Sequence, residues 1–128
     1  MKLNNLQEVD MKKRIKSFKY AIRGIQDVIS GEMNMRIHLF IAVLVVIFGL
    51  VFNISNVEWL VCVLCFAVVM TAEMINTAIE TVVDLVSPSK HELARKAKDV
   101  AAGAVLLSAF FSAIAGLMIF VPKLLAVL

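Results

Sequence analysis

Hydrophobic residues form three long charge-free stretches in the chain, at Leu39–Val57, Trp59–Ala72 and Val100–Pro122. A membrane-spanning helix needs about 20 mostly apolar residues. The first and third stretches have that length, whereas the second reaches it only if its helix continues through Glu73. No Gly or Pro interrupts residues 59–86, so a long helix can continue there. The pattern therefore predicts three membrane helices, at about 36–54, 58–86 and 94–121.

The segment before these stretches has a different pattern, in which apolar residues recur at helical spacing between many charges. Placed on a helix, these apolar positions fall within about 80° of one another, and four basic residues cluster on an adjacent arc. The apolar positions are Met11, Ile15, Phe18, Ile22, Ile25 and Ile29, and the basic ones are Lys12, Lys16, Lys19 and Arg23. We therefore predict an amphipathic helix over 11–30. It lies on the anionic cytosolic membrane surface, packs against the cytosolic end of the protein, or does both.

Composition supports a membrane protein. The chain has 128 residues, of which 61% are hydrophobic and 18% are charged. An ordinary soluble domain is roughly 45–50% apolar and about 25% charged. This excess excludes a disordered tail and a nucleic-acid-binding module. The expected fold class is an all-α membrane protein, with residues 1–128 forming a single domain.

Basic residues predict the orientation of the helices. Eight Lys and Arg residues precede the first charge-free stretch and four follow the second, whereas the turn at 53–58 has none and Lys123 stands alone after the third. Cytosolic loops carry the excess of Lys and Arg. We therefore expect the N-terminus and the connection after the second span to face the cytosol, and the C-terminus to face outward.

One helix face near the end of the second span is acidic. Glu73, Glu80 and Asp84 fall within about 40° of one another on a helix, with Asn76 and Thr77 beside them. Carboxylates at the membrane need a divalent cation, a basic side chain or protonation to offset their charge. Oxygen ligands of this kind suit Mg²⁺, and a carboxylate without metal could accept a proton from a hydroxyl.

Other interpretations of this acidic face remain open from the residues alone. The carboxylates could form salt bridges that hold a non-catalytic membrane subunit together. Glu73 could also be the proton-coupling group of a small exporter, although that role leaves Asn76, Glu80, Lys98 and Asp99 without a task. No phosphate-binding loop or soluble-kinase signature is present in the sequence.

Two further patterns concern packing. Cys62 and Cys65 are spaced as C-x-x-C within the second span, where two thiols make a poor metal site, so we interpret them as packing residues. The third span carries small residues at four-residue steps, which predict close contact between helices. These residues are Ala104, Ser108, Ser112 and Gly116.

The sequence around the acidic face resembles the small prokaryotic membrane lipid kinases, which include diacylglycerol kinases and undecaprenol kinases. The resemblance rests on a block from Glu73 to Asp84, on His91-Glu92-Leu93, and on Ala97-Lys98-Asp99 continuing to Gly103. A weaker block covers residues 21–38. The likeness extends over most of the chain, from about Lys16 to Lys123.

The resemblance implies a homotrimer in the bacterial inner membrane, with composite active sites, that uses ATP and Mg²⁺. By position, Glu73 is similar to the general base of the family, Asn76 to its polar partner, and Glu32 and Glu80 to the metal ligands. The residues similar to nucleotide-binding positions are Ser89, Lys90, His91, Lys98 and Asp99, and more weakly Lys13 (with Arg14) and Tyr20.

The resemblance also implies a substrate. Segments at 23–25 and 32–38, the Glu58-Trp59 turn and the ending at 122–124 are most similar to the Gram-positive branch of the family. That branch implies an undecaprenol kinase that forms undecaprenyl phosphate by direct in-line transfer. Diacylglycerol is the alternative lipid.

Overall fold

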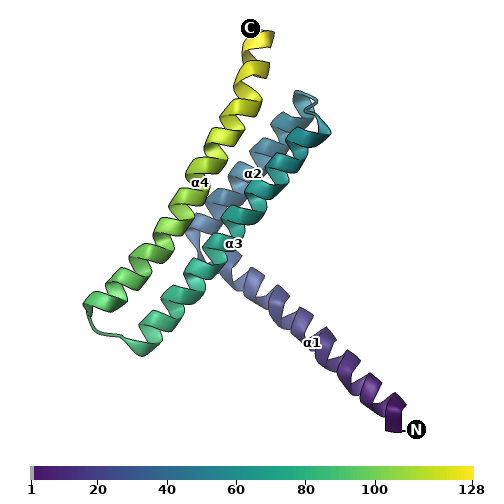
Figure 1. Ribbon diagram of the computed structural model, residues 1–128, viewed down its shortest axis with the longest axis vertical. Coiled ribbons are helices and arrows are strands. Elements are labelled where there is room, and N and C mark those ends of the chain that lie inside the picture. The colour runs from purple at the N-terminus through teal and green to yellow at the C-terminus, as the bar shows by residue number, and fades with distance from the viewer. Residues whose placement is uncertain (1) are drawn as a thin grey trace. The chain divides into compact units, whose positions relative to one another are not determined.

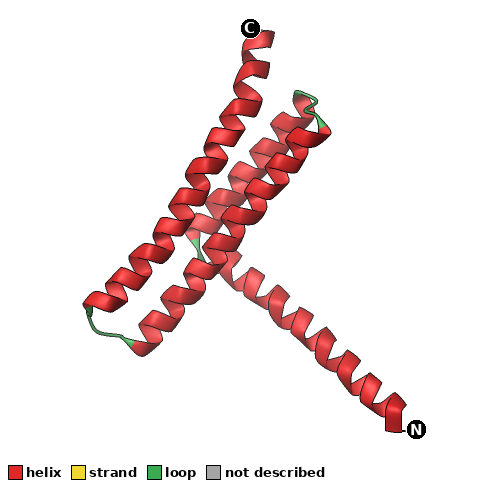
Figure 2. Cartoon of the chain, viewed as in Figure 1, coloured by secondary structure: helices red, strands yellow, loops and turns green. Residues whose placement is uncertain are grey.

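The computed structural model describes residues 2–128, which form four α-helices and, within that range, no β-strand (Figures 1 and 2). The helices are α1 (Lys2–Gly31), α2 (Met33–Val51), α3 (Asn56–Val86) and α4 (Glu92–Val127). The predicted all-α fold is confirmed. Helices α2, α3 and α4 are each long and apolar enough to cross a membrane, as the charge-free stretches predicted.

The chain divides into two compact units between Glu32 and Met33. In the first unit, α1 begins well before the predicted residue 11. Its early turns carry two ion pairs between residues four apart, Lys12 with Glu8 at 2.8 Å and Arg14 with Asp10 at 4.0 Å. Such pairs support a helix by a few tenths of a kcal/mol each. The apolar side chains at 11, 15, 18, 22 and 25 are exposed, and their location on a membrane surface stays a prediction.

In the second unit, a tight turn joins α2 to α3. Asn53 adopts a φ of 48°, in the left-handed region that Asn tolerates better than most residues. Ser55 then caps α3: its hydroxyl accepts from the Glu58 N–H at 3.2 Å, and the Glu58 carboxylate accepts from the Ser55 N–H at 2.7 Å. This reciprocal capping box fixes the start of α3.

Helices α3 and α4 form an antiparallel hairpin whose two ends are each held by an ion pair (Figure 1). Lys98 contacts Asp84 at 2.9 Å near the connection, and Lys123 contacts Glu58 at 3.1 Å near the opposite end. Along α3 the two pairs lie about 39 Å apart at 1.5 Å per residue. This separation is close to the thickness of a bilayer with its polar interfaces, about 40–45 Å.

Helix α2 is shorter than the hairpin and begins partway along α3 (Figure 1). The Trp59 ring lies against Gly49, which fixes the register of the antiparallel pair. Counting from that contact, Met33 lies level with about residue 75 of α3. The end of the hairpin that carries Glu80, Asp84 and Lys98 therefore extends beyond the start of α2.

The buried apolar core of this unit is small and lies near the α2–α3 turn. Ile54, Cys62 and Ile119 form its centre, and the rings of Phe48, Phe52 and Phe120 pack together there with centroids 6.3–6.5 Å apart. Most other apolar side chains of the three helices are exposed. Such exposure suits a protein whose solvent is hydrocarbon rather than water.

The small residues of α4 do not all pack closely. A Cβ added to Gly116 would meet no atom within 4 Å in the described part of the chain outside its own local backbone. No close helix contact forms at Gly116 within the described residues of this chain, and a contact with another copy stays a prediction. Ser112 and Gly116 instead line a cavity between the three helices.

Gly49→Ala should destabilise the protein. A Cβ at this position would lie 2.5 Å and 2.8 Å from two atoms of the Trp59 ring and 3.2 Å from Ile54. Overpacking of this kind costs about 1–3 kcal/mol. We expect a lower Tm in detergent micelles, measured by circular dichroism. Gly103→Ala is the matched control, because its Cβ meets no described atom within 4 Å. Equal Tm values for the two variants would contradict the contact.

Candidate active site

The acidic face of α3 changes from buried to exposed along its length. Glu73 is 1% exposed and Asn76 is 6% exposed, while Glu80 is half-buried and Asp84 is exposed. The register explains this gradient. Met35, itself 3% exposed, lies level with Glu73 on α2, whereas Glu80 and Asp84 lie beyond the start of that helix. A carboxylate is thus held among packed helices at the point where the acidic face begins.

Asn76 offers a buried acceptor beside Glu73. Its side-chain oxygen Oδ1 is buried and makes no hydrogen bond to any atom of the described residues. It borders a groove of about 610 Å³ between α3 and α4, whose α4 wall includes Ala97 and Ala101. A buried polar atom without a partner costs about 1–3 kcal/mol. Asn76 is therefore a residue of the groove wall whose buried side-chain oxygen has no hydrogen-bond partner among the described residues.

Basic side chains meet the outer acids of this face at the start of α4. Lys98 Nζ donates to Asp84 Oδ1 at 2.9 Å. Arg95 contacts both Glu92 and Asp99 through its guanidinium group. The sequence predicted that a basic side chain could offset the charge of a carboxylate on the acidic face. Lys98 does so for Asp84 within the chain. Lys98 and Asp99, predicted to contact nucleotide, already have ionic partners here.

The α3–α4 connection encloses a cavity of about 690 Å³. Five residues predicted to bind nucleotide line it together: Ser89, Lys90, His91, Lys98 and Asp99. Arg95 and Glu92 line it as well, and sequence reasoning did not assign them to this site. The signal was present, because residues 95, 98 and 99 are spaced three and four apart and so share one helix face. The cavity therefore combines three basic groups with hydrogen-bonding side chains.

His91 has a structural role that the sequence did not reveal. It is the N-cap of α4, and its ring atom Nδ1 accepts a hydrogen bond from the Leu93 N–H at 3.1 Å. The cap satisfies one of the four free N–H groups at the helix start. Histidine is not among the preferred N-cap residues, so composition gave no sign of this contact.

Three residues that the sequence assigned to the active site belong to the other unit, namely Lys13, Tyr20 and Glu32. Lys13 and Tyr20 are exposed on α1, where the Arg23 guanidinium lies 5.6 Å from the centre of the Tyr20 ring. Glu32 is half-buried. Within residues 2–128, no group of three or more His, Cys, Asp and Glu side chains lies close enough to hold a metal ion. Metal ligation by Glu32 and Glu80 stays a prediction.

Three helices apolar enough to cross a membrane, a buried carboxylate on one of them and a cavity lined by basic and hydrogen-bonding groups at the α3–α4 connection characterise this protein. The family model described as prokaryotic diacylglycerol kinase matches residues 19–120. The chain belongs to this family. The family's activity is that of a lipid kinase with an alcohol acceptor, so the expectation of an ATP-dependent enzyme is confirmed.

Individual relatives carry two substrate names. An undecaprenol kinase of Bacillus subtilis is 42% identical over 90% of this chain and 94% of its own length. A diacylglycerol kinase of Synechocystis is 42% identical over 88% of this chain and 65% of its own length. A diacylglycerol kinase of Escherichia coli is 29% identical over 73% of this chain and 77% of its own.

His91→Ala should lower the Tm, because the Leu93 N–H loses its acceptor; replacing an N-cap typically costs about 1 kcal/mol. His91→Asn is the matched variant, since Asn is a preferred N-cap residue. We expect the Asn variant to recover the Tm of the unmodified protein. The KM for ATP should be raised in both variants, because both lose the His91 side chain that is predicted to contact the nucleotide. Stability and ATP KM would be measured on the same preparations. A normal ATP KM in the Asn variant would limit His91 to capping.

Proposed function

We propose that this protein is an undecaprenol kinase, which transfers the γ-phosphoryl group of ATP to the hydroxyl of a membrane polyprenol. The observation that carries the proposal is Glu73, a carboxylate buried in an apolar membrane helix beside the buried acceptor of Asn76. Such a carboxylate suits proton abstraction from an alcohol that arrives through the membrane rather than from water. The undecaprenol kinase of Bacillus subtilis supports the choice of lipid, because its similarity covers nearly the full length of both chains.

In the proposed reaction Glu73 orients the lipid hydroxyl and accepts its proton. The alcohol oxygen then forms a bond to the γ-phosphorus while the bond from that phosphorus to the β-bridging oxygen breaks. The products are the lipid phosphate and ADP, and the proton remains on Glu73 until it returns to water. A site of this kind works through positioning and electrostatic stabilisation. In-line geometry is part of the proposal.

A divalent cation fits the carboxylates of the proposed site other than Glu73 and Asp84. Mg²⁺ is usually bound by one or two carboxylates together with substrate phosphates, so it needs no cluster of three protein ligands. Glu80, half-buried one turn before the Asp84–Lys98 pair, and Glu32 are the residues that would hold it. When bound, the ion would offset negative charge on the phosphate oxygens.

The cavity at the α3–α4 connection is the proposed nucleotide site. Lys90, Arg95 and Lys98 line it and supply positive charge for phosphate. Phosphate binding at Lys98 would compete with its ion pair to Asp84. Because the pair is partly exposed, exchanging one anion for another costs little. Lys13 and Tyr20 are proposed to reach the nucleotide from α1.

The assembly and the orientation are also part of the proposal. Three copies of the chain would bury the apolar faces that α3 and α4 expose in a single chain, including Ile75, Val82 and Leu93. The active sites would then be shared between subunits. The distribution of Lys and Arg supports an orientation with the N-terminus and the α3–α4 connection in the cytosol, where ATP is available, and the C-terminus outside. The helix α1 would lie on the cytosolic membrane surface.

A direct assay tests the function. Purified protein in mixed micelles would receive ATP labelled at the γ-phosphate with undecaprenol, diacylglycerol or no lipid. We expect label in undecaprenyl phosphate at a rate well above that in phosphatidic acid. Faster labelling of diacylglycerol would support the alternative that the Synechocystis and Escherichia coli relatives suggest. Label in neither lipid would overturn the proposal.

Glu73→Gln should abolish turnover, because the amide cannot accept the proton. We expect kcat to fall by at least about 100-fold, a typical contribution of a general base. Glu8→Gln is the control, because Glu8 is exposed on α1 and belongs to none of the proposed sites. Retained oligomeric size on a sizing column would show that the Glu73 variant folds. Near-normal turnover would remove Glu73 from the role of base.

Glu80→Gln should raise the Mg²⁺ concentration needed for half-maximal activity, because one carboxylate ligand is lost. Activity would be titrated with Mg²⁺ at fixed ATP, and the shift should be partly reversed at high Mg²⁺. Asp84→Asn is the comparison, since Asp84 is already paired with Lys98. An unchanged Mg²⁺ titration in the Glu80 variant would argue against ligation.

A further inference from the structure

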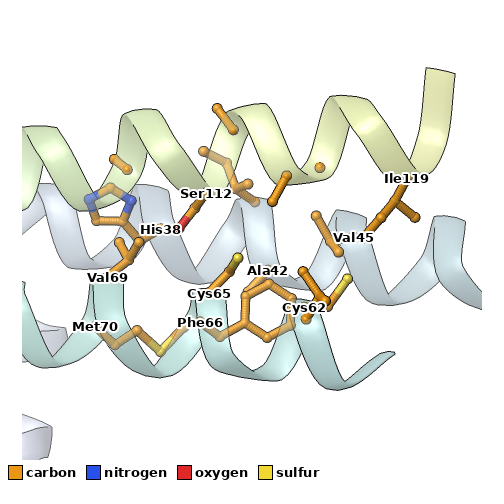
Figure 3. Close-up of a pocket in the computed structure, with 16 residues that line it drawn as sticks. His38, Ala42, Val45, Cys62, Cys65, Phe66, Val69, Met70, Ser112 and Ile119 are labelled. Atoms are coloured by element: carbon orange, nitrogen blue, oxygen red, sulfur yellow. The ribbon is translucent and has the colours of Figure 1, made fainter. Parts of the chain in front are cut away.

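A second cavity, of about 370 Å³, lies between α2, α3 and α4 (Figure 3). Its α3 residues lie within 61–70, so along α3 the cavity is on the side of Glu73 away from the α3–α4 connection. Its lining is almost entirely apolar. His38, Met70 and Ser112 line it at the end nearer Glu73, and Cys62, Val45 and Ile119 line it at the far end (Figure 3). Neither the acidic face nor the nucleotide site accounts for this space.

This cavity continues the acidic face of α3. Cys62, Val69, Glu73 and Glu80 fall within about 40° of one another at 100° per residue. The first two line the cavity and the other two are the proposed base and metal ligand. One helix face thus carries apolar cavity wall as far as residue 70 and carboxylates from residue 73 onward.

The dimensions of the cavity match a single hydrocarbon chain. From residue 70 to residue 61 it extends about 14 Å along α3, and its near end lies about one helical turn from Glu73. If a methylene group takes roughly the volume of a water molecule, about 30 Å³, the space holds about a dozen carbon atoms. A lipid with its hydroxyl at Glu73 must direct its chain away from the nucleotide and toward this space.

We propose that this cavity binds the hydroxyl-proximal part of the chain of a membrane prenyl alcohol and selects for it. The inference rests on the proposed function and adds the determinant of chain recognition. The α4 wall is made of small residues, including Ala109, Ser112 and Gly116, which leave the width that a methyl-branched chain needs. A lipid with two chains attached close to its hydroxyl would have to leave one of them outside.

The selectivity arises from contact rather than from the hydrophobic effect, because bilayer lipid is as apolar as the cavity. A chain that fills the space gains dispersion contacts with its walls and holds the hydroxyl in position. The benefit should therefore stop once the cavity is full. We expect kcat/KM, on a mole-fraction scale in micelles, to rise from prenol through geraniol to farnesol and then to level off.

Gly116→Leu tests this assignment. The Cβ of the new side chain starts from open space, and Gly116 lines the cavity. We expect kcat/KM for farnesol and undecaprenol to fall by about tenfold or more, mainly through KM, as for overpacking of an apolar pocket. The rate with prenol, which does not reach residue 116, should stay within about twofold of that of the unmodified enzyme.

Gly103→Leu is the matched control, since it lies on the same helix, its Cβ also meets open space, and it does not line the cavity. The diagnostic quantity is the ratio of farnesol to prenol turnover, which a general loss of folding would not change. An unchanged ratio in Gly116→Leu would overturn the proposal. Equal changes of the ratio in both variants would also overturn it.

The two cysteines provide an independent measurement on the unmodified protein. The chain has only Cys62 and Cys65, and both line this cavity. Saturating farnesol should slow their alkylation by an apolar maleimide, whereas prenol should not. Equal protection by diacylglycerol would indicate that the cavity holds an ordinary acyl chain of a bilayer lipid. If no lipid protects the cysteines of the active enzyme, a helix of a second copy fills the space. Either result would overturn the proposed role of the cavity without contradicting the proposed kinase function.

Discussion

The structure depends on holding one carboxylate, that of Glu73, out of water inside a bundle of apolar helices. Transfer of an ionised carboxylate from water to an apolar medium is costly, so the surroundings must be arranged for it. Packing around it is therefore tight: Met35 is nearly inaccessible at the same level of α2. The buried acceptor of Asn76 follows within one turn on the same helix. Glu73 and Asn76 are thus two buried polar side chains within one turn of α3.

The α3–α4 hairpin makes that burial possible by anchoring its ends outside the apolar region. The Lys98–Asp84 and Lys123–Glu58 pairs lie at opposite ends of the two helices. Partly exposed pairs contribute little stability individually. Their positions matter more, because an ion pair is favourable at a polar interface and unfavourable in hydrocarbon. In the proposed membrane arrangement both pairs lie at polar interfaces, and Glu73 lies between them along α3.

Much of this arrangement could be predicted from local sequence pattern, because helix periodicity and the length of apolar runs depend on neighbouring residues. The three long helices and the acidic face of α3 are of this kind. Contacts between distant residues could not be predicted: the ring of Trp59 on Gly49, the pairing of Lys98 with Asp84, and the cap formed by His91. The start of α1 at Lys2 was also missed, because its first ten residues lack a strong apolar repeat.

The small residues of α4 illustrate how the same pattern can have two physical meanings. Small side chains at four-residue steps allow two helices to approach, but they also leave space where the helices do not approach. Gly116 belongs to the second case, because nothing in the described residues lies where its Cβ would be. An empty apolar space costs stability through lost dispersion contacts. The cavity is in line with the carboxylates of α3, so an occupant there would gain the dispersion contacts that the space lacks. In the proposed reaction that occupant is the chain of the alcohol whose hydroxyl reaches Glu73, which relates this space to the chemistry.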